Sequence, residues 1–308
     1  MADLEAGLAA LRDAAAGNTP MVSLSPAEAR ERVVLGNRLC ADGPDVSVTD
    51  LPAGDGRPVP VRVYEGDQAL VTLVYAHGGG WVTGDLDYAD ELHRFLAAEA
   101  DVRVVSVDYR LAPEHPFPAG LDDLAATWTW VAATYDEPLA LGGDSAGGNL
   151  AAALAVRGPQ PGPSFLVLAY PVLGRPGGTA SYRRRAGAFP TGAADMRWFF
   201  EHYLAGQEPG DVSDLVPISA PDLVHLPPTH VVVAGHDPLH DEGAALVTAL
   251  DALGVPATLS DHEDLCHGFL RFTAVSEGAR SARSALVAQV KRLAAGAAIP
   301  AERTNSCL

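Results

Sequence analysis

The chain has 308 residues, 48% of them hydrophobic, and 21 basic against 39 acidic side chains give a formal net charge of −18 at pH 7. This hydrophobic content is ample for a large core. So acidic a surface disfavours nucleic acid and anionic membranes as partners, since both are negatively charged.

No segment predicts export, a membrane span or a metal centre. Residues 1–5 are acidic and lack the basic region of a signal peptide, and no apolar run approaches the roughly 18 residues of a membrane span. The cysteines at 40, 266 and 307 are too few and too scattered for a disulfide framework or a zinc site. We therefore expect a cytoplasmic protein without a transmembrane helix.

Helical signals open the chain. Leucines spaced i, i+4, i+7 within residues 3–16 predict an amphipathic helix. A second helix is expected to begin at Ser25, because Ser25 can cap it, Pro26 suits its first turn and Glu28 completes a capping box. We assign residues 1–45 to an N-terminal helical cap segment.

Turn residues follow this segment. The stretch 42–58 is rich in Gly, Asp and Pro and predicts turns rather than regular structure. Residues 59–64 alternate between apolar and polar side chains, which is typical of a strand. Because Pro60 cannot donate to a sheet, we expect this strand at an edge.

Short apolar runs and helical patterns then alternate to the end of the chain. The runs, which are typical of strands buried on both faces, are 70–76, 102–107, 138–141, 165–169 and 231–234. The helical patterns are 88–99, 121–133, 149–156, 241–253 and 279–294. Such alternation predicts a doubly wound α/β fold with a mainly parallel sheet.

One segment interrupts the alternation. Between residues 171 and 228 no strand pattern is evident, and an aromatic-rich stretch suggests helices. We therefore expect a catalytic domain over residues 46–300 with a helical cap insertion at about 175–212, followed by a flexible tail at 301–308.

The sequence around Ser145 predicts a nucleophile. Gly143-x-Ser145-x-Gly147 follows an apolar run and precedes an alanine-rich helical run, as in a nucleophile elbow. The turn is tight, so residues two away from the serine must lack bulk. The N–H groups of the new helix would then favour a developing oxyanion. An all-β trypsin-like protease also carries Gly-Asp-Ser, but a helix straight after the serine argues against that fold.

A second glycine motif follows the first buried strand. The His-Gly-Gly-Gly-Trp segment at 77–81 is of the type that forms part of an oxyanion hole in esterases, because glycine lets backbone N–H groups approach a substrate oxygen. Either motif could be an ordinary glycine turn. Both together, each directly after a buried strand, indicate acyl-transfer chemistry.

An acid and a base follow Ser145 in the order expected of such hydrolases. Asp237 comes just past a predicted strand, where α/β sheets build their sites. Asp241 and Glu242 are rivals, although both are expected in the first turn of a helix, where carboxylates favour the dipole. His267, in a Leu-Cys-His-Gly-Phe segment past the strand at 257–260, is the predicted base.

Two other histidines imitate a metal site. His236 and His240 stand four residues apart beside Asp237 and Asp241. No further ligand motif supports this reading, and we expect no metal there.

Taken together, these motifs resemble the hormone-sensitive-lipase (bacterial type IV) family of α/β-hydrolase carboxylesterases. The resemblance covers residues 60–275, and its motifs are 77–87, 107–119, 142–149, 237–242 and 267–269. The sequence departs from the family pattern in three places, which are alanine at position 76, the segment 213–219 and the segment 174–191. The last two leave the substrate open.

The resemblance implies an α/β-hydrolase fold and a catalytic triad of Ser145, Asp237 and His267. It also implies an oxyanion hole from the N–H groups of Gly79, Gly80 and Ala146, with Gly78 as a further candidate, and a brace under that loop from residues 109–114. It implies no metal, no cofactor and a small-molecule ester as substrate, of short to medium acyl chain. Family members often dimerise, so the resemblance leaves a homodimer open.

Three aromatic residues, Trp81, Trp198 and Phe199, are candidate walls of the substrate pocket, with core packing as the equal alternative. Two other functions stay open from the sequence. One is a lyase, cyclase or acyltransferase on the same fold, because a fold does not fix its chemistry. The other is a receptor-like protein that binds a ligand without catalysis.

Overall fold

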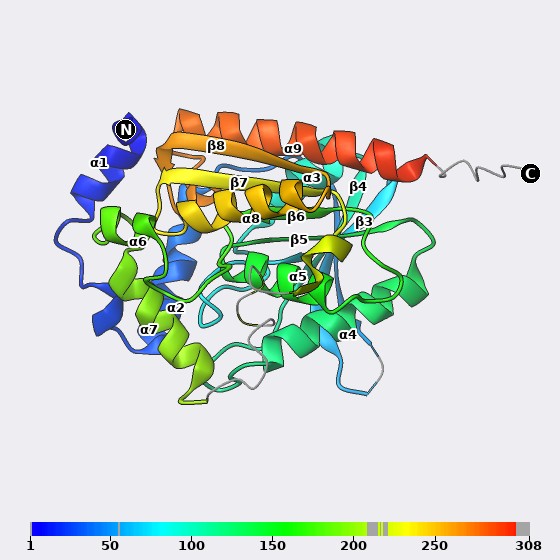
Figure 1. Ribbon diagram of the computed structural model, residues 1–308, viewed down its shortest axis with the longest axis horizontal. Helices are drawn as coiled ribbons and strands as arrows, with labels where there is room; N and C mark the ends of the chain where they lie inside the picture. Colours follow the sequence, from blue (N-terminus) through cyan, green and yellow to red (C-terminus); the bar gives the residue numbers. More distant parts are fainter. Residues whose placement is uncertain (1, 55, 208–214, 216, 218–220, 300–308) are drawn as a thin grey trace, which may run out of the picture.

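The computed structural model describes residues 2–54, 56–207, 215, 217 and 221–299. Within these residues eight strands form one sheet in the order β1-β2-β4-β3-β5-β6-β7-β8 (Figure 1). The strands are β1 Ser47–Ala53, β2 Val59–Glu65, β3 Val71–Ala76, β4 Val102–Val107, β5 Leu139–Asp144, β6 Leu166–Ala169, β7 Thr229–His236 and β8 Ala257–Cys266.

The sheet is mainly parallel, as the sequence predicts. Strands β3 to β8 run parallel to one another, whereas β2 is antiparallel to both β1 and β4. Every residue of β3, β5 and β6 is buried, so these near-continuous apolar runs are covered on both faces. The carboxyl ends of β3, β5 and β7 therefore lie along the same edge of the sheet.

Two predictions at the start of the sheet are wrong. Residues 47–53 form strand β1, where the sequence predicts turns. Because β1 occupies the edge, the strand that contains Pro60 lies inside the sheet, between β1 and β4. Pro60 is tolerated there because it pairs with Pro52 of β1, and its carbonyl accepts a hydrogen bond from Asp108 on the other side (3.0 Å).

Helices cover both faces of the sheet, which confirms the α/β expectation. The helices among the described residues are α1 Ala6–Ala14, α2 Pro26–Gly36, α3 Asp90–Glu99, α4 Ala119–Thr134, α5 Ala146–Val156, α6 Ala180–Arg184, α7 Ala193–Leu204, α8 His240–Ala252 and α9 Glu277–Ala298. Helices α3 and α9 pack in one apolar cluster, and α4, α5 and α8 pack in another. Figure 1 shows these two layers on opposite sides of the strands.

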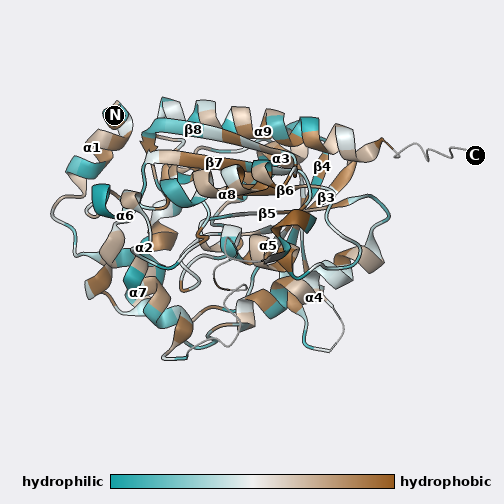
Figure 2. Ribbon diagram, in the orientation of Figure 1, coloured by the Kyte–Doolittle hydropathy of each residue, from teal (hydrophilic) through white to brown (hydrophobic). Residues whose placement is uncertain are grey.

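The polarity of the strands follows their position in the sheet. In Figure 2, β7 is strongly hydrophobic, whereas β8 is largely hydrophilic. This agrees with the burial of most of β7 and with β8 being exposed or half-buried except at its last two residues, since β8 lies at the edge of the sheet.

The N-terminal helices and the insertion lie together. Figure 1 shows α1, α2, α6 and α7 gathered at one end of the molecule. Helix α2 begins as predicted, with the Ser25 side chain accepting from Glu28 N–H and Glu28 completing the capping box. The insertion contains α6 and α7 and, in its described part, no strand. The end of the predicted insertion, from residue 208, and the predicted tail at 301–308 lie outside the described residues. No helix in the described ranges is both long and apolar enough to cross a membrane.

Candidate active site

Ser145 occupies a strained turn between β5 and α5. Its backbone φ is +53° and ψ is −116°, a conformation that L side chains seldom adopt and that marks functional turns. The flanking glycines are required by close contacts. A Cβ on Gly143 would lie 2.4 Å from the carbonyl carbon of Gly147, and one on Gly147 would lie 2.0 Å from the carbonyl oxygen of Ala76. The Gly-x-Ser-x-Gly pattern is therefore a packing requirement of the turn.

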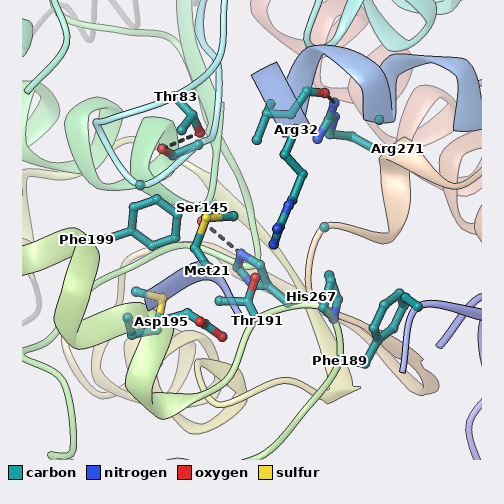
Figure 3. Close-up of a pocket in the computed structure, with 18 of the residues that line it drawn as sticks. Met21, Arg32, Thr83, Ser145, Phe189, Thr191, Asp195, Phe199, His267 and Arg271 are labelled. Carbon is teal, nitrogen blue, oxygen red and sulfur yellow. Dashed lines mark hydrogen bonds between the residues drawn. The ribbon is translucent and has the colours of Figure 1, made fainter. Parts of the chain in front are cut away.

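The three residues predicted as a triad lie together in hydrogen-bond contact. Ser145 Oγ is 2.9 Å from His267 Nε2, which Figure 3 shows as a dashed line, and His267 Nδ1 is 2.7 Å from Asp237 Oδ2. Asp237 is fully buried, and its second oxygen accepts from the Leu239 N–H (2.8 Å). Both carboxylate oxygens thus have partners, so the carboxylate and the imidazole ring are held in place.

The charges around His267 stabilise its protonated form. Burial by itself lowers the pKa of His267, but the charge of Asp237, the hydrogen bond to it and the charge of Asp144 together raise that pKa above 6.5. A raised pKa makes the ring a stronger base toward the Ser145 hydroxyl.

The rival acids contact other groups. Glu242 accepts hydrogen bonds from the N–H groups of Leu173 (2.7 Å) and Gly174 (2.8 Å), which anchors the segment after β6. Asp241 accepts from the Ser181 N–H (2.8 Å) at the start of α6. Both lie in the first turn of α8, as predicted. In this structure these carboxylates connect helix α8 to the segment after β6 and to the start of α6.

The histidines that imitate a metal site bind other partners. His240 Nε2 is 3.0 Å from Asp261 Oδ2, and His236 Nε2 is 3.0 Å from the Ala2 carbonyl oxygen. No group of three or more potential metal ligands is formed by the described residues.

The glycine loop after β3 faces Ser145. Gly79 (φ +109°) and Gly80 (φ +60°) adopt left-handed backbone conformations that favour glycine. A Cβ on Gly80 would also lie 2.1 Å from the ring of Phe199. Neither N–H group has an acceptor among the described residues. The N–H of Ala146, first residue of α5, is one of the free donors of a helix N-terminus.

Gly78 differs from its neighbours. Its N–H donates to Asp144 Oδ1 at 3.0 Å, so it is not free for a substrate, and the suggestion that Gly78 contributes to an oxyanion hole is wrong in this structure. The brace under the loop is as expected. The Tyr109 hydroxyl donates to the His77 carbonyl (2.8 Å), and the Ala112 N–H donates to the Trp81 carbonyl (2.9 Å).

A cavity of about 350 Å³ opens onto Ser145 and His267. Figure 3 shows the side chains that line it, including Phe199 from α7 and Arg32 from α2. The prediction for the other two aromatic residues is wrong. Trp81 and Trp198 do not line this cavity, and the Trp81 ring is 1% exposed and stacks on Tyr203 with centroids 4.3 Å apart.

Sequence reasoning missed most of the cavity wall. The missed residues, contributed by the N-terminal segment, the insertion and the loop after His267, include Met21, Arg32, Phe189, Met196, Arg271 and Phe272. They have no shared motif, because three separate segments converge only in the folded chain.

Known proteins that are similar to this chain include esterases of the α/β hydrolase fold. The sequence profile of the α/β hydrolase fold family matches residues 73–271. The chain is 38% identical to carboxylesterase NlhH of Mycobacterium tuberculosis over 268 residues, covering 81% of this chain and 83% of that protein. It is 34% identical to an ethyl acetate hydrolase of Pseudomonas putida, covering 84% and 88%. The structure of a hyperthermophilic esterase from Pyrobaculum calidifontis superimposes with a TM-score of 0.87 at 35% identity, covering 95% and 99%.

Proposed function

This chain belongs to the hormone-sensitive-lipase-like carboxylesterases of the α/β-hydrolase fold and is a carboxylic ester hydrolase, and on that premise we propose that it acts through an acyl-enzyme on Ser145. The observation that carries the proposal is the contact chain from Ser145 Oγ through His267 to the buried Asp237. Nucleophile, base and orienting acid are the three parts that serine catalysis requires.

In the first half-reaction, His267 Nε2 removes the proton from Ser145 Oγ as that oxygen attacks the ester carbonyl. Asp237 keeps the proton on Nδ1 and stabilises the imidazolium that forms. The carbonyl oxygen becomes an oxyanion that accepts hydrogen bonds from the N–H groups of Gly79, Gly80 and Ala146. Losing one such donor typically costs roughly 100- to 1,000-fold in kcat.

The first half-reaction ends when the imidazolium of His267 donates its proton to the departing alcohol as the C–O bond breaks, which leaves the acyl group on Ser145. In the second half-reaction water attacks this acyl-enzyme, and His267 accepts a proton from the water. The imidazolium then returns that proton to Ser145 Oγ as the bond between Oγ and the acyl carbon breaks, so the carboxylic acid product departs and the enzyme is regenerated.

We propose short to medium acyl chains as substrates. The cavity volume of about 350 Å³ supports this size range, because sites for small ligands begin at roughly 300 Å³. The Phe199 ring packs against the glycine loop and limits the space beside the reacting carbonyl. Rates on p-nitrophenyl acetate, butyrate, octanoate and laurate test this range, and a maximum at laurate would contradict it.

The test of the nucleophile is intact-mass spectrometry after exposure to a phosphonofluoridate, with the labelled peptide mapped. We expect a single adduct on Ser145, none in Ser145→Ala, and loss of p-nitrophenyl butyrate turnover in both Ser145→Ala and His267→Ala. An adduct on another serine would contradict the assignment. Adduct formation without ester turnover would favour a lyase, cyclase or acyltransferase, and ligand binding with no adduct would favour a receptor.

We also propose that the enzyme acts in the cytoplasm and that it can form a homodimer. In the described part of the sheet β8 pairs only with β7, so its outer edge is available to a second copy. Light scattering on an eluting size-exclusion peak tests the dimer, and a monomer mass across the working concentration range would exclude it.

A further inference from the structure

The charge of the cavity wall is opposite in sign to the charge of the protein. The whole chain carries a formal net charge of −18. The cavity lining nevertheless includes two arginines, Arg32 and Arg271, and one carboxylic acid, Asp195. A local excess of positive charge therefore faces the space in which a substrate must sit.

Arg32 is the member of this pair that is free to meet a ligand. It projects from α2, and Figure 3 shows its side chain extended into the cavity toward Ser145 and His267. One of its N–H groups donates to the Thr19 carbonyl (2.6 Å). Among the residues that the structure describes, its remaining N–H groups have no acceptor and no carboxylate lies within 4.0 Å of it.

Arg32 interacts electrostatically with two acids, Glu28 and Asp195, but both carboxylates form hydrogen bonds with other groups. Glu28 forms the capping box with Ser25 at the start of α2. Asp195 accepts from the Gly192 N–H (2.8 Å) at the start of α7. Each carboxylate completes a helix N-terminus, so neither forms an ion pair with Arg32.

Arg271, by contrast, is committed to the protein. Its guanidinium lies 3.9 Å from the centre of the Tyr88 ring and donates to the carbonyl of Val33 (3.0 Å) and to Asn37 Oδ1 (2.5 Å). These contacts attach the loop after His267 to helix α2. Arg271 adds positive charge to the cavity, but its Nη2 donates to two protein oxygens, its guanidinium lies over the Tyr88 ring and its Nε is buried.

We propose that Arg32 binds a carboxylate on the substrate, so that this enzyme favours esters that carry a second, free carboxylate group. The inference rests on the proposed function, because it assumes that the scissile ester is attacked by Ser145 in the same cavity. A guanidinium presents parallel N–H donors that match the two oxygens of a carboxylate. Within a partly enclosed cavity this pairing is less screened than at the surface.

The carboxylate can belong to either side of the ester. A half-ester of a dicarboxylic acid carries it on the acyl side, whereas an acylated hydroxy acid carries it on the alcohol side. Two matched pairs of substrates separate these sources. Monoethyl adipate is compared with its terminal amide, and 4-acetoxybutanoate is compared with 4-acetoxybutanamide. Each pair differs in charge but hardly in size.

The readout is the ratio of kcat/KM for the carboxylate to kcat/KM for the amide, measured by product chromatography. In the wild-type enzyme we expect this ratio to exceed one for one of the pairs, and to fall about 10- to 100-fold in Arg32→Gln, the range for a hydrogen bond to a charged group. Arg32→Lys should retain part of the preference, and added salt should weaken it.

Arg38→Gln is the matched control. Arg38 is exposed, lies just after α2 and does not line the cavity, so its replacement removes the same charge from the protein surface alone. We expect wild-type ratios from it. A fall of the same size in Arg38→Gln would overturn the proposal, because the effect would then follow overall charge.

The remaining outcomes are equally decisive. Ratios that do not change between wild type and Arg32→Gln, for both pairs, would overturn the proposal while leaving ester hydrolysis intact. A wild-type enzyme that is folded by circular dichroism but hydrolyses no ester would instead overturn the proposed function, and this inference with it. If Arg32→Gln does not fold, Arg32→Met is used instead, because it preserves the aliphatic stem. We expect the same fall in the ratio of kcat/KM values from this variant.

Discussion

The carboxylate of Asp144 accepts a hydrogen bond from the Gly78 N–H, with 3.0 Å between Oδ1 and the nitrogen. Asp144 is the residue immediately before Ser145, and Gly78 is the residue immediately before Gly79. This bond therefore joins the turn that holds the nucleophile to the loop that would receive the oxyanion. The Tyr75 hydroxyl donates to the same oxygen (3.3 Å), and Asp144 is 2% exposed.

We predict that Asp144 is a positioning residue and that Asp144→Ala lowers kcat by about 10- to 100-fold with little change in KM. The variant leaves the Gly78 N–H without an acceptor, so the loop can shift, and a shift of about 1 Å near the reacting atoms has an effect of that order. Asp144→Asn keeps an oxygen that can accept the bond and should retain most of the activity. Steady-state kinetics on p-nitrophenyl butyrate check both. Equal losses in the two variants would mean that charge, rather than the hydrogen bond, is what matters.

A second prediction concerns Gly147. A Cβ at this position would lie 2.0 Å from the Ala76 carbonyl oxygen and 2.4 Å from that of His77. Both atoms belong to backbone at the end of β3, which cannot move without displacing the glycine loop. We expect Gly147→Ala to destabilise the fold by about 3 kcal/mol or more and to abolish activity. Urea denaturation and p-nitrophenyl butyrate turnover measure the two effects.

The control for this substitution is Gly296→Ala. A Cβ on Gly296, in helix α9, meets nothing within 4 Å. The same change there should stabilise the protein by about 0.5–1 kcal/mol, since glycine is a poor helix former. If Gly147→Ala proves as mild, the close approach of the elbow to β3 is not a real constraint.

These contacts explain why much of the site could be predicted from sequence. The glycines around Ser145 are needed by the turn itself, so the pattern is local and visible in the chain. Asp237 and His267 each follow a strand, and parallel strands bring their carboxyl ends to one edge. The order of these residues in the chain and their positions at strand ends are thus sufficient to predict that residues 145, 237 and 267 lie close together.

What could not be predicted depends on contacts between distant segments. The Gly78 N–H is unavailable to a substrate because it donates to the side chain of Asp144, and no rule of sequence spacing predicts that hydrogen bond. Trp81 adjoins the glycine loop, but its ring is buried in the core, where it stacks on Tyr203 of α7. Strand β1 is mostly exposed and contains Asp50 and Pro52, so it lacks the apolar alternation by which strands are recognised.

The acid limb of the pH–rate profile offers a third prediction. His267 must be neutral to accept the serine proton, and its pKa is raised above 6.5 by the charge of Asp237 and the hydrogen bond to it, followed by the charge of Asp144, against the effect of burial. We therefore expect kcat/KM to fall with acidification at a midpoint above pH 6.5. In Asp144→Asn the midpoint should move downward, because one of the charges that raise this pKa is gone. A wild-type midpoint below 6.5 would contradict the electrostatic argument.

The last prediction concerns a histidine outside the site. His93 of α3 is fully buried, and its ring contacts Tyr64 and Tyr75 edge-on, with centroids 5.2 and 4.7 Å away. Neither ring nitrogen has a hydrogen-bond partner in the described structure. Burial lowers the pKa of His93 from 6.5 to about 3. Below pH 6.5 the unfolded chain therefore binds a proton that the folded protein does not.

His93 should therefore make the fold sensitive to acid. Its folded-state pKa lies below its unfolded value, so its contribution to stability is complete above pH 6.5 and is lost as the pH falls toward 3. We predict that His93→Phe reduces the slope of unfolding free energy against pH by about 1.4 kcal/mol per pH unit in that range. Urea denaturation of both proteins at pH 5 and 6 gives the slopes. At pH 8 the ring is neutral in both states, so the difference there reports packing alone. Parallel slopes would show that the buried ring takes up its proton without unfolding the protein.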